Sequence, residues 1–387
     1  MTSSQPRIVI NTLSARTGGG LTYARNLLMH LDLEYRADVF VLVAPQRRHL
    51  LPDGPYTFID CAWAGQNVLQ RTLWEAFGLP RLLRELGADV YYVLAGTLAA
   101  KPPAGCKSVV AFRNLLPFDP KNRKRYPHGY TRYRLWLIGL AQPRSFAQAD
   151  LVIFISEYGR KVVEAVVTEP AGRAVVIPHG VGEVFKGDVV AGDWNTRWPG
   201  GYVLYVSILD VYKSQLEVVE AWASIRGARE TREKLILAGP EYPPYARRVK
   251  RKIAELGLED EVVLLGPVAH DDLPGLYRSS KVTVFASQCE NCPNILLEAM
   301  AGGRPVLCSS DPPMPEFGVD AVVYFDPTDS AELADRLIEM LDDPERQKDY
   351  GDRAKRRSAD FRVDAAMRRT WESMLELANG DWSKSGD

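Results

Sequence analysis

Long apolar runs are absent from the 387-residue sequence. No stretch of about 18 apolar residues occurs, so we expect no membrane-spanning helix. The first residues, MTSSQPR, lead directly into the short apolar run IVI. A secretory signal needs a basic segment followed by a longer apolar one, so none is predicted.

Cysteine is also scarce, with five residues in the whole chain. A low and odd count argues against a disulfide framework and favours a reducing compartment, so we expect a cytoplasmic protein. Cys289 and Cys292 form a C-x-x-C pair, but a zinc site would need two further ligands near by. A redox pair needs a lowered thiol pKa, which Glu290 would instead raise. We predict that both cysteines are packing residues and that no metal is bound.

Acidic residues are unevenly distributed along the chain. Residues 1–180 carry 22 Lys and Arg against 13 Asp and Glu, and the remainder carries 26 against 36. Such a split favours contact between one half and an anionic surface, although drift of surface charge would give the same counts.

Residues 120–149 contain no Asp or Glu. Their bases are interleaved with aromatic residues: Lys121, Arg123, Lys124, Arg125, Arg132, Arg134 and Arg144 with Tyr126, Tyr130, Tyr133 and Trp136. Residues 121–144 could therefore lie on an anionic membrane surface, at the inner face, or bind a lipid-linked pyrophosphate acceptor. An ordinary packed helix with exposed bases is the alternative. Nucleic acid is not expected, because no recognised binding module accompanies the segment.

Short apolar runs alternate with helix-length segments through both halves of the chain. Buried parallel strands read as such runs, and they are Ile8–Ile10, Val39–Val43, Val90–Leu94, Val109–Phe112, Leu151–Ile155, Val175–Ile177, Tyr202–Ile208, Lys234–Ala238, Val262–Leu265, Val282–Phe285, Val306–Cys308 and Val322–Tyr324. The alternation predicts an α/β protein with two Rossmann-like, doubly wound domains facing across a cleft, where a ligand would bind.

The expected boundaries follow from composition. We assign residues 1–180 to an N-terminal acceptor domain and 181–363 to a C-terminal donor domain, with the linker within 180–200. A helix at 364–378 is predicted from its apolar face, and 379–387 should be a disordered tail.

Two loops have the composition of anion sites. Gly18–Gly20 lies between a strand and a helix, where free amides favour an anion, although a tight turn is the alternative. The pattern is not G-x-G-x-x-G, and no acidic residue ends Val39–Val43, so a dinucleotide is not indicated. Lys213 precedes S-Q-L-E, a capping box that predicts a helix start at Ser214. Lys213 could reach a phosphate there, or be an ordinary solvated lysine.

Two glutamates follow the predicted strand Val282–Phe285. Glu290 lies in the loop after the strand and Glu298 in the next helix, one turn beyond Asn294 on the same face. Helical side chains lean toward the N-terminus, so the two carboxylates should converge. Carboxylates accept hydrogen bonds from hydroxyl groups, and backbone amides together with a lysine can hold a diphosphate. The combination suits a nucleotide sugar.

The E-x7-E spacing, followed by AMAGGRPVLCS, resembles the retaining glycosyltransferases of family 4, which have the GT-B fold. The resemblance extends over most of the chain, through LVIFISEYGRK (151–161), VIPHGV (176–181), LYVSILDVYKS (204–214), LILAGPE (235–241), LGPVAHDDLPGLYRSSKVTVFASQ (265–288) and MPEFGVDAVVYFDP (314–327).

The resemblance implies a role for each matching residue. Glu298 resembles the glutamate on the ribose, Glu290 the one at the donor sugar and reacting centre, and Lys213 the lysine on the diphosphate. The other implied donor contacts are Gly19, Gly20, Ser207, Val268, Asn294, Ile295 and Leu296, and the last helix is implied to return to the first domain.

Two positions depart from the family pattern. Ser207-Ile208-Leu209 stands where many relatives have an arginine, in G-R-L, so one phosphate contact is missing. Arg113-Asn114 stands where many have a histidine or His-Asp, which leaves these two residues as candidate sugar or acceptor contacts.

The implied activity is metal-independent transfer of a hexose, with retention, from a UDP- or GDP-linked sugar. The acceptor would be a glycan or lipid-linked molecule of bacterial cell-envelope polysaccharide assembly. A front-face or a double-displacement route would both retain configuration. Three alternatives stay open: a catalytically silent partner protein of the same fold, a nucleotide-sugar epimerase and a phosphorylase.

Overall fold

The computed structural model describes residues 5–16, 18–167, 172–185, 194–230 and 232–380. The chain forms two compact units. The first unit comprises residues 1–118, 133–178 and 363–387, and the second comprises 119–132 and 179–362. Residues 119–132, which the sequence analysis assigned to the N-terminal domain, thus group with the second unit. Most of the predicted tail and much of the predicted linker lie outside the described residues.

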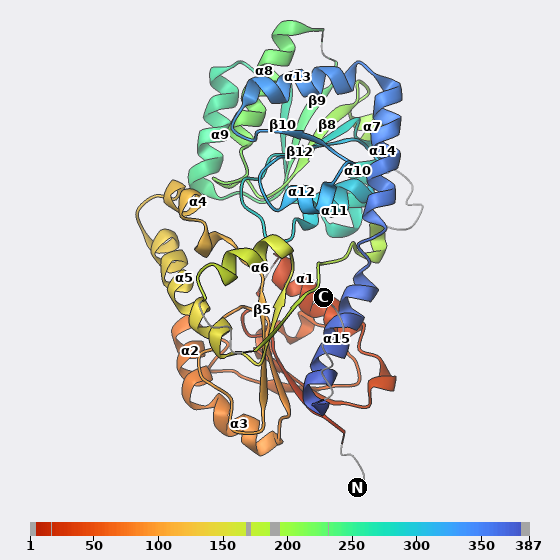
Figure 1. Ribbon diagram of the computed structural model, residues 1–387. Coiled ribbons are helices and arrows are strands. Elements are labelled where there is room, and N and C mark those ends of the chain that lie inside the picture. Colours follow the sequence, from red (N-terminus) through yellow and green to blue (C-terminus); the bar gives the residue numbers. More distant parts are fainter. Residues whose placement is uncertain (1–4, 17, 168–171, 186–193, 231, 381–387) are drawn as a thin grey trace. The chain divides into compact units, whose positions relative to one another are not determined.

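The first unit is built on a seven-stranded parallel sheet (Figure 1). Its order is β3-β2-β1-β4-β5-β6-β7, with bounds β1 Arg7–Asn11, β2 Asp38–Val43, β3 Thr57–Asp60, β4 Val90–Val93, β5 Lys107–Phe112, β6 Leu151–Phe154 and β7 Arg173–Val176. The strands other than β3 match predicted ones. β3 was missed because this edge strand, TFID, is only half-buried and shows no continuous apolar run.

Helices cover both faces of this sheet: α1 Gly18–Met29, α2 Val68–Phe77, α3 Leu79–Leu86, α5 Tyr130–Gln148, α6 Glu157–Glu164 and α15 Val363–Asn379, with the 3₁₀ helices η1 Leu33–Tyr35, η2 Pro45–Leu50 and η3 Leu116–Phe118. In Figure 1, α1 and α15 lie on one side of the sheet and α2 and α3 on the other. The prediction that Gly18–Gly20 form a loop is wrong, because they form the first turn of α1. Gly18 has φ +61°, which lets the chain turn into the helix.

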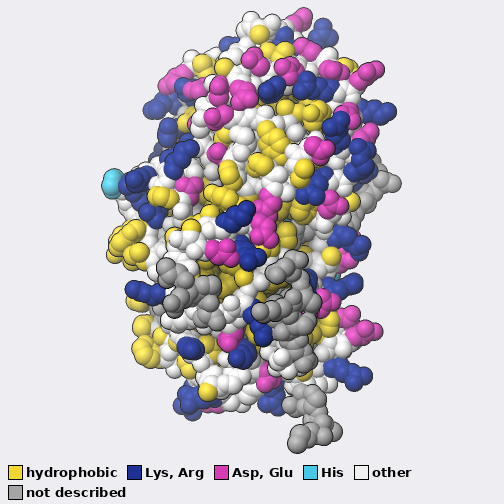
Figure 2. All heavy atoms as spheres, in the orientation of Figure 1, with side chains coloured by type: hydrophobic (Ala, Val, Ile, Leu, Met, Phe, Trp, Pro, Cys, Tyr) yellow, Lys and Arg dark blue, Asp and Glu magenta, His cyan; other side chains and the backbone are white. Residues whose placement is uncertain are grey.

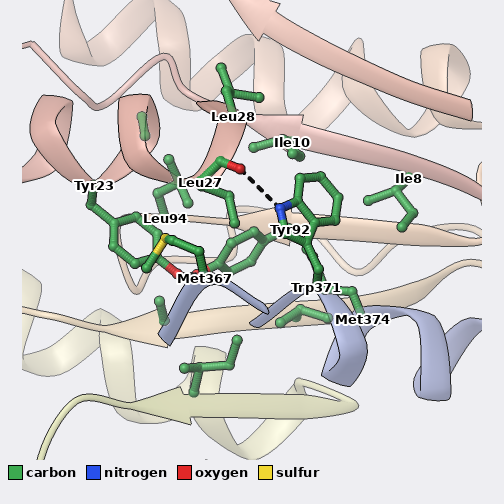
Figure 3. Close-up of a cluster of buried hydrophobic side chains, with 14 of the residues drawn as sticks. Ile8, Ile10, Tyr23, Leu27, Leu28, Tyr92, Leu94, Met367, Trp371 and Met374 are labelled. Carbon is green, nitrogen blue, oxygen red and sulfur yellow. Dashed lines mark hydrogen bonds between the residues drawn. The ribbon is translucent and has the colours of Figure 1, made fainter. Parts of the chain in front are cut away.

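The last helix completes the core of the first unit (Figure 3). Trp371 of α15 is fully buried among side chains of β1, β4 and α1. Its indole Nε1 donates a hydrogen bond of 2.9 Å to the carbonyl oxygen of Leu27. A buried tryptophan finds a partner for its N–H in this way, which fixes the position of α15 against α1.

The second unit contains a six-stranded parallel sheet in the order β10-β9-β8-β11-β12-β13. Its elements are β8 Tyr202–Val206, β9 Lys234–Ala238, β10 Val262–Gly266, β11 Val282–Phe285, β12 Val306–Ser309 and β13 Val323–Phe325, with helices α4 Pro120–Arg125, α7 Trp194–Arg197, α8 Gln215–Ala228, α9 Pro243–Glu255, α10 Leu273–Ser279, α11 Asn294–Ala301, α12 Met314–Gly318, α13 Ser330–Leu341 and α14 Pro344–Ser358, and the 3₁₀ helices η4 Glu183–Phe185 and η5 His270–Asp272. All six strands were predicted, to within two residues at each end.

Each sheet reverses its strand order at one place. The reversal lies between β1 and β4 in the first unit and between β8 and β11 in the second. Ligands of doubly wound sheets bind at the carboxyl ends of the strands beside such a switch point. The two switch points are therefore the places to look for function. In the part of the chain that the structure describes, no helix is long and apolar enough to cross a membrane.

Candidate functional site

Lys213 lies in the loop that follows β8 and is almost completely buried, with 4% of its side chain exposed. Its ammonium group forms an ion pair with Glu290. It also lies 4.9 Å from the ring centroid of Tyr212 and 5.5 Å from that of Phe285. A buried cation needs such a partner, and the aromatic faces add favourable cation–π contacts. Lys213 is therefore no solvated lysine.

Glu290 lies in the loop after β11. Its Oε1 contacts both loops at the switch point, the one after β8 and the one after β11. The same oxygen that pairs with Lys213 accepts a 2.7 Å hydrogen bond from the hydroxyl of Ser287. The carboxylate is thus held in one orientation, with 17% of its side chain exposed. An ammonium group has three donors, so Lys213 can bind Glu290 and still donate to a phosphate.

Ser214 does not form the predicted capping box. It precedes α8 with φ +52°, and its side chain makes no hydrogen bond to the backbone of the first turn. Its hydroxyl oxygen instead accepts a 2.7 Å hydrogen bond from Nε2 of Gln288. The left-handed backbone turns the side chain away from the helix amides, so the predicted capping box is wrong. The helix start predicted at Ser214 is confirmed, because Ser214 is the N-cap of α8. Gln288, which sequence reasoning missed, joins the Glu290 loop to the Lys213 loop.

Glu298 lies on α11 and is mostly buried, with 18% of its side chain exposed. Burial raises the pKa of this carboxyl from 4.5 to about 8. The group is therefore mainly protonated at neutral pH and can both donate and accept hydrogen bonds. Its Oε1 lies 4.0 Å from Nε2 of His270. Glu298 thus contacts η5, after the Val268 loop, whereas Glu290 contacts the Lys213 loop.

The start of α11 is held by a residue that sequence reasoning missed. Nδ1 of His179 lies 2.9 Å from Oδ1 of Asn294, and His179 comes from the VIPHGV segment. Ile295 and Leu296 follow in the first turn of this helix. N–H groups of a first turn have no intrahelical partners and can serve an anion. The backbone N–H of Asn294 itself donates to the carbonyl of Cys292 at 3.0 Å.

Ser207 is buried at the end of β8, and its hydroxyl donates to the carbonyl of Ile208 at 3.1 Å. Gly239 has φ +146°, and a Cβ there would lie 2.1 Å from the carbonyl oxygen of Ser207. Only glycine allows β9 to approach this closely. Val268 is half-buried in the loop between β10 and η5.

Cys289 and Cys292 are both buried. Burial, together with the nearby carboxylates of Asp119 and Glu290, raises the pKa of the Cys289 thiol well above its ordinary value. A thiol held in its protonated form is a poor nucleophile and a poor metal ligand. Among the described residues, no three His, Cys, Asp or Glu side chains gather as metal ligands would.

Residues 119–126 pack on the second unit beside the Lys213 and Glu290 loops. Asn122 is buried, and its Nδ2 donates to the carbonyl of Gln288 at 3.4 Å. The hydroxyl of Tyr126 donates to Asp210 Oδ2 at 2.9 Å, and Arg125 lies 3.6 Å from Glu217. This part of the basic segment is therefore engaged with protein, which the sequence pattern did not indicate.

Four predicted site residues lie in the first unit, at the carboxyl ends of β1 and β5. Nη2 of Arg113 donates to the carbonyl of Gly19 at 2.8 Å, and its guanidinium lies 4.0 Å from the ring centroid of Tyr23. Gly20 follows in the same turn of α1. Asn114 accepts a 3.2 Å hydrogen bond from the backbone N–H of Leu116. The structure thus brings Arg113 to the glycine turn, while Asn114 supports its own loop.

Two family models match the chain, one in each half. The model described as glycosyltransferase family 4 matches residues 17–183, and the one described as glycosyl transferases group 1 matches residues 195–357. Both halves of the chain thus match glycosyltransferase models, which together with the two Rossmann-like sheets indicates a glycosyltransferase of GT-B fold.

The chain is 27% identical over 236 residues to the O-antigen chain mannosyltransferase B of Escherichia coli, with 58% of each protein covered. It thus spans less than two thirds of that relative. It is 25% identical over 297 residues to the alpha-D-kanosaminyltransferase of Streptomyces kanamyceticus, covering 73% of this chain and 75% of that one. The fold matches Anabaena HepE, solved in complex with UDP and glucose, with a TM-score of 0.71, 18% identity, and 95% and 99% of the chains covered.

Proposed function

We propose that the protein transfers a hexose, with retention of configuration, from a UDP- or GDP-linked sugar to a glycan or lipid-linked acceptor in bacterial polysaccharide assembly. The observation that carries this proposal is the buried Lys213–Glu290 pair at the switch point of the second sheet. It supplies a cation for a diphosphate and a carboxylate for sugar hydroxyls in one place. The relatives named as mannosyl- and kanosaminyltransferases support the same class of reaction.

The proposed step is a front-face substitution. The acceptor hydroxyl attacks the anomeric carbon on the face that the diphosphate leaves. The bond between that carbon and the phosphate oxygen breaks, and the hydroxyl proton passes to the diphosphate. Lys213 and the amides of Ile295 and Leu296 would stabilise the negative charge that develops on the leaving group. Glu290 would orient the sugar, Glu298 the ribose, and no metal would be required.

A transfer assay tests the proposal. UDP- and GDP-hexoses are incubated in EDTA with simple methyl hexosides, and release of the nucleotide is followed. We expect nucleotide release from one donor, strong loss of activity in Lys213→Ala and no loss in Lys234→Ala. Lys234 begins the neighbouring parallel strand β9, at the opposite edge of the sheet from Lys213. Anomeric proton couplings of the product should show retention. An inverted product, or release that does not depend on Lys213, would contradict the proposal.

We further propose that the protein acts at an anionic membrane surface on the cytoplasmic side, through residues 130–144. Large hydrophobic side chains of α5 are exposed to solvent: Tyr130, Tyr133, Trp136, Leu137 and Leu140. No acidic residue lies near them in the sequence. In Figure 2 hydrophobic side chains reach the surface along the edge that α5 occupies in Figure 1. Such a face suits a bilayer interface. Flotation with anionic liposomes should show binding that weakens with salt, and absence of salt-sensitive binding would contradict it.

A further inference from the structure

A short segment of the chain packs against the loop that carries Lys213. Residues 119–132 belong to the second unit, although the residues before and after them in the sequence belong to the first. Within this segment Tyr126 is the C-cap of α4. Its ring centroid lies 5.8 Å from that of Tyr242, the N-cap of α9, and Figure 1 shows α4 beside this end of α9.

The side chain of Tyr126 reaches a buried carboxylate. Its hydroxyl donates a 2.9 Å hydrogen bond to Oδ2 of Asp210, and both residues are buried. Burial raises the pKa of Asp210, while the hydrogen bonds from Val211 and Tyr126 and the charge of Lys213 act in the opposite direction. A buried carboxylate is costly unless donors satisfy it. Tyr126 is therefore one of the groups that make Asp210 tolerable at this position.

Asp210 in turn shapes the backbone that carries Lys213. Its Oδ1 accepts a 2.7 Å hydrogen bond from the backbone N–H of Val211. Its carbonyl oxygen accepts a 2.9 Å hydrogen bond from the backbone N–H of Lys213, which closes a turn of four residues. One carboxylate thus joins Tyr126, through Oδ2, to the turn that presents Lys213, through Oδ1.

The segment also touches the second loop of the proposed donor site. The carbonyl of Gln288 accepts a 3.4 Å hydrogen bond from Nδ2 of Asn122, and the backbone N–H of Gln288 donates to the carbonyl of Tyr212 at 2.8 Å. A charged group stabilises a phosphate best when neighbouring contacts hold it in place before the ligand arrives. The contacts of Asn122 and Tyr126 are of this supporting kind.

We propose that Tyr126 is a positioning residue for Lys213, acting through Asp210, so that residues 119–126 form part of the donor site. The proposal rests on the proposed function, because it takes Lys213 to bind the donor diphosphate. Without the Tyr126 hydroxyl, Oδ2 of Asp210 loses this donor while the carboxylate stays buried. The turn is then held less firmly, and Lys213 binds the second phosphate less well.

The ratio of the affinities for a nucleoside diphosphate and its monophosphate tests this role. UDP and UMP, and GDP and GMP, are titrated calorimetrically into the full chain in the presence of EDTA. Tyr126→Phe keeps the ring but removes a hydrogen bond to a charged group, so the ratio should fall about fivefold. The affinity for the monophosphate should stay within about twofold, because the monophosphate lacks the second phosphate that Lys213 would bind.

Tyr202→Phe is the matched control. Tyr202 begins β8, and its buried hydroxyl donates a 2.6 Å hydrogen bond to the carbonyl of Leu276. This variant therefore also loses one buried tyrosine hydrogen bond of the second unit, but at the opposite end of β8 from Lys213. Both variants should unfold at lower urea concentration, and only Tyr126→Phe should change the affinity ratio. A purely structural role of Tyr126 would leave the ratio unchanged in both.

A double variant shows whether the tyrosine acts through the lysine. Lys213→Ala alone should lower the affinity ratio, and adding Tyr126→Phe should lower it no further. An unchanged ratio in Tyr126→Phe, or an equal decrease with and without Lys213, would overturn the proposal.

Titration of the wild-type protein keeps this failure separate from failure of the proposed function. A nucleotide that binds with a ratio insensitive to Tyr126 would refute the positioning role alone. Binding of neither UDP nor GDP would refute the donor site, and the positioning role with it.

Discussion

The switch points of the two sheets share a topology but differ in charge balance. At β8 and β11, the single buried cation Lys213 is matched by Glu290, and Glu298 is neutralised by burial. At β1 and β4, Glu75 accepts a hydrogen bond from Asn11 and lies 3.9 Å from Arg71 Nε, and burial raises the pKa of its carboxyl. The same strand order thus delivers polar side chains to the same edge, while the balance of charges selects the ligand. A buried cation matched by a carboxylate suits sugar hydroxyls and a diphosphate together.

The largest effect on activity is expected when the Lys213–Glu290 pair, the matched pair, is broken. Glu290→Ala should lower turnover by about 10²-fold or more, because it removes the carboxylate that orients the sugar beside Lys213. Nucleotide affinity should change much less, since Lys213 is then released to the diphosphate. Steady-state kinetics and calorimetry measure the two quantities. Glu345→Ala, on the exposed side of α14, is the control, and full activity of Glu290→Ala would remove Glu290 from the site.

Glu298→Ala should separate ribose recognition from chemistry. Loss of its hydrogen bonds to ribose hydroxyls should weaken nucleotide binding about tenfold, which corresponds to about 1.4 kcal/mol. Comparison with Glu290→Ala is informative, because that variant should mainly lower turnover, whereas Glu298→Ala should mainly weaken nucleotide binding. Unchanged nucleotide affinity in calorimetric titration would overturn the assigned role.

The protonated state of Glu298 should also make the free energy of unfolding depend on pH. Its pKa is raised by burial from 4.5 to about 8, so the folded protein keeps a proton that the unfolded chain loses. The contribution of Glu298 is fully present below pH 4.5 and is lost as pH rises toward about 8, by up to ~1.4 kcal/mol per pH unit. In urea unfolding, the free energy of unfolding should decrease less between pH 6 and pH 8 in Glu298→Gln than in the wild-type protein. An identical decrease would argue that the carboxyl is ionised.

The smallest effect is expected from the cysteines beside the matched pair. Cys289→Ser combined with Cys292→Ser should leave activity within about twofold and lower the free energy of unfolding by ~1 kcal/mol. Activity and bound zinc are measured on the same preparation. Loss of activity together with loss of bound zinc would restore the metal interpretation.

The sequence predicted most of the fold because buried parallel strands are continuous apolar runs, which are visible locally. TFID was missed because an edge strand needs no such run. The sequence also placed Glu290 and Glu298 on the correct loop and helix. It could not show that Ser214 turns toward Gln288, or that residues 119–126 pack on the second unit, because both depend on contacts between distant segments.

The most direct test of the donor site is calorimetric titration of the full chain with UDP and GDP in the presence of EDTA. The account predicts that one nucleotide binds clearly without metal, and that Glu298→Ala weakens its binding. Binding of neither nucleotide, or binding that requires a metal ion, would contradict the donor site proposed at Lys213, Glu290 and Glu298.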